Sequence, residues 1–396
     1  MKMMTKIPNG DWREIVRQFT PNWFAATMGT GILALMINAY PYSFYGQIYL
    51  ARGLWVINVL FFILFAALFL ARAVFYPVMF MRLFRHPVQS LFIGAIPMGL
   101  ATVINGIFLL WPTNSLSISI SFSLWIIVVI LSIISVLLIP YYMFTAHENS
   151  MNRMTAAWLL PIVPPEVAAA SGGMLATHLA PSMASWVVYS GYVLWAISVP
   201  LAFGIMAILF LRLTLHKLPN RDMAVSAWLP LGPLGTGALA MLVLGHADGY
   251  AFAHTPLASM AQFSHMAGTF IAFLLWGLGL WWMAMAVLFT LRYLKEGLPF
   301  NMGWWGFTFP LGVYTSATFT LARETQFPIL LPLGAVFTLL LSVLWAVVTW
   351  KSFLGMWSGQ LFRAPCLSQE TGLPEPVCPV PIITSHPDLM KTLRND

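Results

Sequence analysis

The chain has 396 residues, of which 60% are hydrophobic and only 8% charged, and its formal net charge is +7 at pH 7. This composition excludes an ordinary soluble globular protein. In a membrane protein an excess of Lys and Arg reflects the cytoplasmic loops, so we expect no nucleic-acid partner. Cys366 and Cys378 stand in a polar C-terminal stretch and indicate neither a disulfide framework nor a metal site. We therefore expect an integral membrane protein that needs no metal and no cofactor.

Long apolar stretches predict an all-α membrane protein with ten transmembrane helices, because each stretch is long enough to cross a bilayer. An amphipathic cytoplasmic segment, residues 1–21, is expected before the transmembrane domain of residues 22–352. Residues 353–396 carry six prolines and few apolar runs, which predicts a flexible cytoplasmic tail. In chain order the predicted helices cover residues 22–40, 49–74, 90–111, 118–144, 156–179, 184–214, 225–246, 264–294, 302–322 and 327–351.

The basic residues indicate how these helices are oriented. Of the 19 lysines and arginines, all except Arg52 and Arg323 fall before the first helix, in the last residues of an even-numbered helix, or after one. An error of one helix in the count would mix the two groups. By the positive-inside rule, both termini are cytoplasmic, in a bacterial inner membrane or a plasma membrane.

The predicted helices alternate in character and form an internal repeat. Even-numbered helices are bulky and apolar, whereas odd-numbered ones carry glycine, proline, threonine and serine. The repeated positions Thr27, Pro97, Pro165, Pro233 and Pro310 are spaced by 70, 68, 68 and 77 residues, which indicates one helical hairpin used five times. Because small residues allow close helix packing, we predict odd helices inside even ones, in a pseudo-fivefold arrangement around a central pore. Helix breaks or kinks are expected at Gly29, Pro97, Pro165, Pro233 and Pro310.

Small hydroxyl and amide side chains follow these breaks and are the predicted lining of the pore. Such groups donate hydrogen bonds to an anion without adding a fixed charge, and helix N-termini add positive dipole ends. No lysine or arginine lies in the middle of a predicted inner helix, so an anion would bind weakly and pass. The predicted lining residues are Thr30, Thr102, Asn105, Ser171, Thr236, Thr315 and Thr318.

Phe309 directly precedes the break at Pro310 in the fifth repeat, where the other repeats carry Ala26, Ile96, Pro164 and Gly232. One large ring in a narrow pore closes it by steric block or by dewetting, so Phe309 is the predicted gate. The alternative is that Phe309 only packs between helices, as most phenylalanines do.

Glu166 is the one acidic residue within the predicted inner helices. An ionisable residue at membrane depth is a functional candidate, here for coupling transport to protons. The alternative is that it caps backbone groups freed by the break. His178, His246, His254 and His265 fall near the external side without a metal-binding motif, and we interpret them as ordinary loop residues. An integral-membrane enzyme would need a convergent pair of ionisable groups, so we expect a transporter and no enzyme.

Several motifs together resemble the tellurite-resistance/dicarboxylate transporter family, also described as voltage-dependent or slow-type anion channels. The resemblance implies ten helices in five hairpins around a pore, a homotrimer with one pore per protomer, and occlusion of that pore by Phe309. It extends over all five repeats. The motifs are Asn22-Trp23-Phe24, Met28-Gly29-Thr30-Gly31, Ile96-Pro97-Met98-Gly99-Leu100, Leu229-Pro230-Leu231-Gly232-Pro233-Leu234-Gly235 and Gly303-Trp304-Trp305-Gly306-Phe307-Thr308-Phe309-Pro310.

The region Gly306–Pro310 is especially similar to fungal malate permeases and sulfite efflux pumps. We therefore expect transport of malate-like dicarboxylates, with sulfite or small inorganic anions such as chloride and nitrate as the alternative. The sequence leaves open which anion is preferred, the direction of transport, and the choice between a channel and a proton-coupled carrier.

Overall fold

A computed structural model describes residues 12–253, 255–357 and 361. Within these ranges the regular structure is helical and contains no strand. The first eleven residues of the predicted N-terminal segment and most of the predicted tail, including both cysteines, lie outside the described residues.

Each predicted transmembrane range contains one long helix, and most observed ends lie within a few residues of the predicted ones. Two short helices, α1 (Trp12–Gln18) and α4 (Pro77–Arg85), lie outside these ranges. Helix α1 lies within the predicted N-terminal segment 1–21, and α4 lies between two predicted transmembrane ranges. The long helices are α2 (Phe24–Ala39), α3 (Gln47–Phe75), α5 (Ala95–Leu110), α6 (Ser115–Thr145), α7 (Pro164–Ala176), α8 (Pro181–His216), α9 (Leu231–Ala251), α10 (Ala261–Glu296), α11 (Thr308–Thr325) and α12 (Leu330–Trp357).

Seven of the described helical segments are long and apolar enough to cross a membrane. The segments that contain α5 and α9 bury 72% and 83% of their most apolar stretch inside the protein, against 17% for α3 and 33% for α6, α8, α10 and α12. The shorter helices α2, α7 and α11 are buried along almost their whole length. The odd-numbered predicted helices are thus buried inside the protein, as expected. The even-numbered, bulky helices expose apolar side chains on the outer surface.

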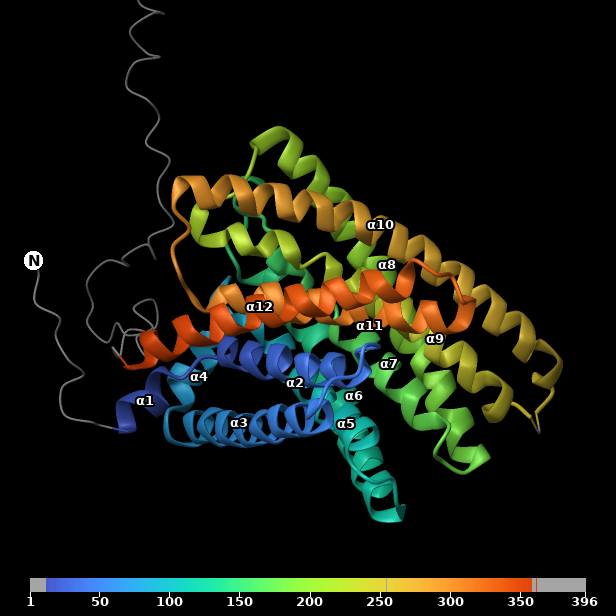
Figure 1. The fold of residues 1–396 in the computed structure, drawn as a ribbon. Coiled ribbons are helices and arrows are strands. Elements are labelled where there is room, and N and C mark those ends of the chain that lie inside the picture. Colours follow the sequence, from blue (N-terminus) through green and yellow to red (C-terminus); the bar gives the residue numbers. More distant parts are fainter. Residues whose placement is uncertain (1–11, 254, 358–360, 362–396) are drawn as a thin grey trace, which may run out of the picture.

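The buried helices follow one another in a closed circuit of contacts. Helix α2 packs on α5, α5 on α7, α7 on α9, α9 on α11, and α11 returns to α2. Each of them also packs on the long outer helix that follows it in the chain. Figure 1 shows α2 and α11 near the middle of the molecule with α3 and α12 beside them. We call α2, α5, α7, α9 and α11 the inner helices, and α3, α6, α8, α10 and α12 the outer helices.

The repeated prolines begin the inner helices. Pro97, Pro165, Pro233 and Pro310 lie in the first turn of α5, α7, α9 and α11. The first four N–H groups of a helix have no partner within it, so proline loses nothing there. The predicted breaks are therefore helix starts and not kinks within a helix. They follow the 3-10 segments η2 (Ser90–Gly94), η4 (Ala156–Leu159), η5 (Arg221–Trp228) and η7 (Met302–Phe307).

The first repeat differs from the other four. The break expected at Gly29 is absent, because α2 continues without interruption from Phe24 to Ala39. The backbone instead changes in the 3-10 segment η1 (Pro21–Trp23), which begins with a proline. The expectation for Gly29 was wrong because this repeat carries its proline before the helix.

A repeated tryptophan joins the two layers of helices. In every outer helix one indole N–H donates a hydrogen bond to the inner helix of the next hairpin, and the last hairpin donates to the first. These tryptophans are spaced by 70, 70, 81 and 69 residues, a repeat that the sequence analysis missed. The pairs are Trp55 to the Val103 carbonyl (3.1 Å), Trp125 to the Ala168 carbonyl (2.8 Å), Trp195 to the Gly237 carbonyl (3.0 Å), Trp276 to the Thr318 hydroxyl (2.9 Å) and Trp345 to the Thr30 hydroxyl (3.0 Å).

Candidate functional site

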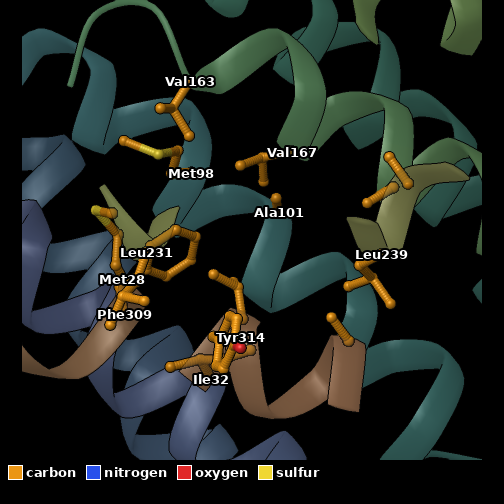
Figure 2. Close-up of a cluster of buried hydrophobic side chains, with 14 of the residues drawn as sticks. Met28, Ile32, Met98, Ala101, Val163, Val167, Leu231, Leu239, Phe309 and Tyr314 are labelled. Carbon is orange, nitrogen blue, oxygen red and sulfur yellow. The ribbon is translucent and has the colours of Figure 1, made fainter. Parts of the chain in front are cut away.

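Phe309 lies where the inner helices converge. Its side chain is 4% exposed and belongs to a buried apolar cluster with Met28 of α2, Met98 of α5 and Leu231 of α9 (Figure 2). Val163, which directly precedes α7, completes the contribution of all five hairpins. Apolar side chains from all five hairpins are therefore grouped around Phe309, and we call these five residues the Phe309 cluster.

The start of α11 fixes the position of Phe309. The hydroxyl of Thr308 donates to the carbonyl of Trp305 at 2.7 Å, and the Trp305 indole donates to the Ser352 hydroxyl in α12 at 3.1 Å. Phe307 points elsewhere, since its ring packs edge-on against Trp228 at a centroid distance of 5.5 Å. The two phenylalanines thus have different environments although they are two residues apart.

Three of the predicted lining hydroxyls lie between the helix layers. Thr30 and Thr318 accept bonds from the indoles of Trp345 and Trp276. Thr102 accepts a bond from the Asn58 amide at 3.0 Å. These hydroxyls are turned toward the outer helices, which differs from the pore-lining position that we expected. Sequence alone does not separate the two positions, because each inner helix is buried on all sides.

The remaining predicted lining residues divide into two kinds. Thr315 donates to the Leu311 carbonyl of its own helix at 2.7 Å. Ser171 and Thr236 are buried, and their hydroxyls have no hydrogen-bond partner within the described part of the chain. The same holds for the side-chain oxygen of the half-buried Asn105. A buried polar atom without a protein partner calls for a water or a ligand, so Ser171 and Thr236 are the strongest candidates to contact a passing anion.

Glu166 is fully buried in the first turn of α7. An acidic side chain there complements the helix dipole, which agrees with a structural role. The only polar side chain that interacts with the carboxylate among the described residues is Ser198, whose hydroxyl already donates to the Ile162 carbonyl at 2.7 Å. Oε2 lies 3.5 Å from the point where a Cβ on Gly237 of α9 would stand. Helix capping therefore leaves this carboxyl group unexplained, and it remains a functional candidate.

Two of the histidines are not isolated loop residues. His246 and His265 both lie within ion-pair distance of Glu324, at 3.9 and 3.1 Å. His178 lies apart from them and stacks on Phe108 at 5.5 Å, and His254 is outside the described residues. Positions 246, 265 and 324 are too far apart in sequence for a motif to reveal the cluster.

Nearly the whole chain is similar to known membrane transport proteins. The family model of the voltage-dependent anion channel matches residues 18–353. The sulfite efflux pump SSU1 of Arthroderma benhamiae is 38% identical over 358 residues, which cover 89% of this chain and 94% of that protein. An uncharacterized transporter of Methanocaldococcus jannaschii is 30% identical over 351 residues, 88% of this chain and 98% of that protein. The malic acid transport protein of Schizosaccharomyces pombe is 24% identical over 356 residues, with coverages of 87% and 80%.

Proposed function

The chain belongs to the voltage-dependent anion channel family, and from this premise we propose that it carries sulfite-like oxyanions across a membrane along the axis of its inner helices. The observation that carries this proposal is the Phe309 cluster, to which all five hairpins contribute a buried apolar side chain, and we propose that it forms a constriction in the pathway. A constriction of this kind blocks ions until its side chains move apart.

We propose sulfite before malate as the transported anion, which reverses the order expected from the sequence. The relative named a sulfite efflux pump is 38% identical to the chain, whereas the one named a malic acid transport protein is 24% identical. Dicarboxylates such as malate are the second candidate class. Chloride and nitrate are further alternatives.

We propose that all ten long helices cross the membrane, as five hairpins in pseudo-fivefold order. The closed circuit of inner helices and the five tryptophan bonds support this arrangement. Helix α7 has 13 residues, which span only about 20 Å of the roughly 30 Å hydrocarbon layer. The buried stretch 156–163 continues this crossing, where protein shields its irregular backbone from lipid.

Both termini are then cytoplasmic, in an inner or plasma membrane. A homotrimer, which the family resemblance implies, completes the proposal.

In this mechanism the anion passes the Phe309 cluster when the Phe309 ring moves aside. The free hydroxyls of Ser171 and Thr236 replace part of its hydration shell and bind it weakly, because they carry no charge. Glu166 takes up and releases a proton during transport, which couples the flux of the anion to pH.

Flux measurements on purified protein in liposomes test the proposed substrate. Sulfite, malate and chloride are offered separately, with empty liposomes as the control. Faster protein-dependent flux of sulfite than of malate and chloride is expected. Faster flux of malate would restore the dicarboxylate assignment, and no flux of any anion would contradict the proposed function.

A further inference from the structure

Three potential metal ligands meet at the C-terminal ends of two inner helices. His246 lies near the end of α9, His265 in the first turns of α10, and Glu324 near the end of α11. One ligand atom from each residue lies within 4.8 Å of the others. Phe309 lies in the first turn of α11 and Glu324 in its last turn. Along the helix axis the three ligands are therefore about 22 Å from Phe309.

The two histidines approach different oxygens of the Glu324 carboxylate. Nε2 of His265 is 3.1 Å from Oε2 of Glu324, and Nδ1 of His246 is 3.9 Å from Oε1. Ligand atoms of a tetrahedral zinc ion, at bond lengths of about 2.0–2.1 Å, are separated by about 3.4 Å. The two distances between a histidine and Glu324 lie on either side of this value, and all three ligand atoms lie within 4.8 Å of one another, so side-chain rotations bring the three ligands into place.

Helix packing holds the backbone of this cluster in position. A Cβ on Gly245 of α9 would lie 3.1 Å from Cα of His265. Helices α9 and α10 therefore touch beside His246, and α9 packs on α11 as well. The ligands thus come from three packed helices and do not depend on a loop.

A buried acidic residue, Asp248, lies next to the three ligands. Asp248 is buried, interacts electrostatically with His265, and accepts a hydrogen bond from the Tyr192 hydroxyl at 2.7 Å. Its carboxylate also interacts with the side chain of Ser264, which directly precedes His265. Outer carboxylates commonly orient metal-binding histidines and raise their basicity. Asp248 is suited to this supporting role.

We propose that His246, His265 and Glu324 form a binding site for a divalent transition metal ion of the Zn²⁺ class. Two imidazoles and one carboxylate are a ligand set that zinc uses when a fourth position stays open to water or another ligand. His246 is exposed and the other two residues are half-buried, so an ion reaches the site from solution. The bound ion ties α9, α10 and α11 together at this end of the molecule. The proposal does not depend on which anion the protein carries.

The test uses the full chain, purified with a tag that contains no histidine and treated with a chelator. Titration with Zn²⁺ is expected to show saturable binding of one ion per chain and a rise in thermal stability. Co²⁺ is expected to give the visible absorption of a tetrahedral site. Glu324→Gln and His265→Gln each weaken binding by at least about tenfold. His178→Gln, a histidine outside the cluster, leaves binding unchanged.

Gel filtration and the thermal transition without metal show that each variant is folded. Absence of saturable Zn²⁺ binding to the wild-type protein would overturn the proposal. Wild-type affinity in both Glu324→Gln and His265→Gln would overturn it as well, and the three residues would then be an ordinary ion-pair cluster.

Discussion

The indole Nε1 of Trp345 in α12 lies 3.0 Å from the hydroxyl oxygen of Thr30 in α2, although 315 positions separate the two residues. This bond joins the last long helix of the described chain to the first. Four other tryptophans make the corresponding bond between consecutive hairpins. One repeated interaction thus joins each outer helix to the inner helix of the next hairpin, and the Trp345 bond completes the circuit.

Trp345→Phe is expected to destabilise the protein, because it removes the indole N–H and keeps an aromatic ring. A hydrogen bond between transmembrane helices contributes about 0.6 kcal/mol on average and at most about 1.7 kcal/mol. The midpoint of thermal unfolding in detergent is the measurement. The matched control is Trp350→Phe in the same helix, where the side chain is 64% exposed. Equal midpoints for the two variants would show that the bond to Thr30 contributes nothing.

Gly235→Ala is expected to lower stability strongly, because α9 and α11 touch at this point. A Cβ at position 235 would lie 2.6 Å from the backbone nitrogen of Tyr314, and only a shift of one helix relieves that contact. Gly232→Ala is the control, since a Cβ there meets nothing within 4 Å. It should leave the stability unchanged or raise it by up to about 1 kcal/mol. A Gly235→Ala protein as stable as Gly232→Ala would contradict the close packing of these helices.

Much of the helix arrangement follows from the sequence for a simple reason. Runs of about 20 apolar residues are required by the bilayer, and the alternation of small and bulky helices reflects two different neighbours, protein and lipid. The sequence does not predict the amphipathic helix α4, because its nine residues lie between two transmembrane ranges and are too few to form a membrane-length apolar stretch.

The candidate site was harder to predict. The sequence places Phe309 beside a break within the predicted helix 302–322, whereas in the structure it lies in the first turn of α11. The sequence does not show which face of a fully buried helix a hydroxyl occupies, so Thr30 and Thr102 could not be distinguished from Thr236. Only the packed structure shows that Trp345 and Asn58 already use the first two. Side chains that meet through tertiary packing alone, such as His265 and Glu324, leave no periodic signal.

Thr236→Val is expected to reduce anion flux, because it removes a buried hydroxyl that has no partner in the described protein and nearly keeps the volume of the side chain. Loss of one hydrogen bond of about 1 kcal/mol corresponds to a roughly fivefold weaker interaction with the anion. Thr315→Val is the matched control, since that hydroxyl already bonds the Leu311 carbonyl. Initial rates of flux over a range of anion concentrations separate the two variants. If both transport alike, Thr236 does not contact the anion.

Glu166→Gln is expected to abolish the dependence of anion flux on pH, because the amide neither takes up nor releases a proton. The substitution preserves the shape of the buried side chain, so the fold should be retained. Flux at two pH values is compared for wild type, Glu166→Gln and Glu296→Gln. Glu296 pairs with the exposed Arg292 at the end of α10 and serves as the control. Unaltered pH dependence in Glu166→Gln would leave this residue with a structural role only.

Flux through Phe309→Ala in liposomes tests the central claim most directly. Removal of the ring opens the cluster shared by all five hairpins, and anion flux should rise at least about tenfold, which corresponds to a barrier lower by about 1.4 kcal/mol. Phe307→Ala removes an equally buried ring that packs against Trp228, and it should leave the flux near the wild-type rate. If Phe309→Ala inserts correctly and conducts no faster than Phe307→Ala, Phe309 does not close the pathway.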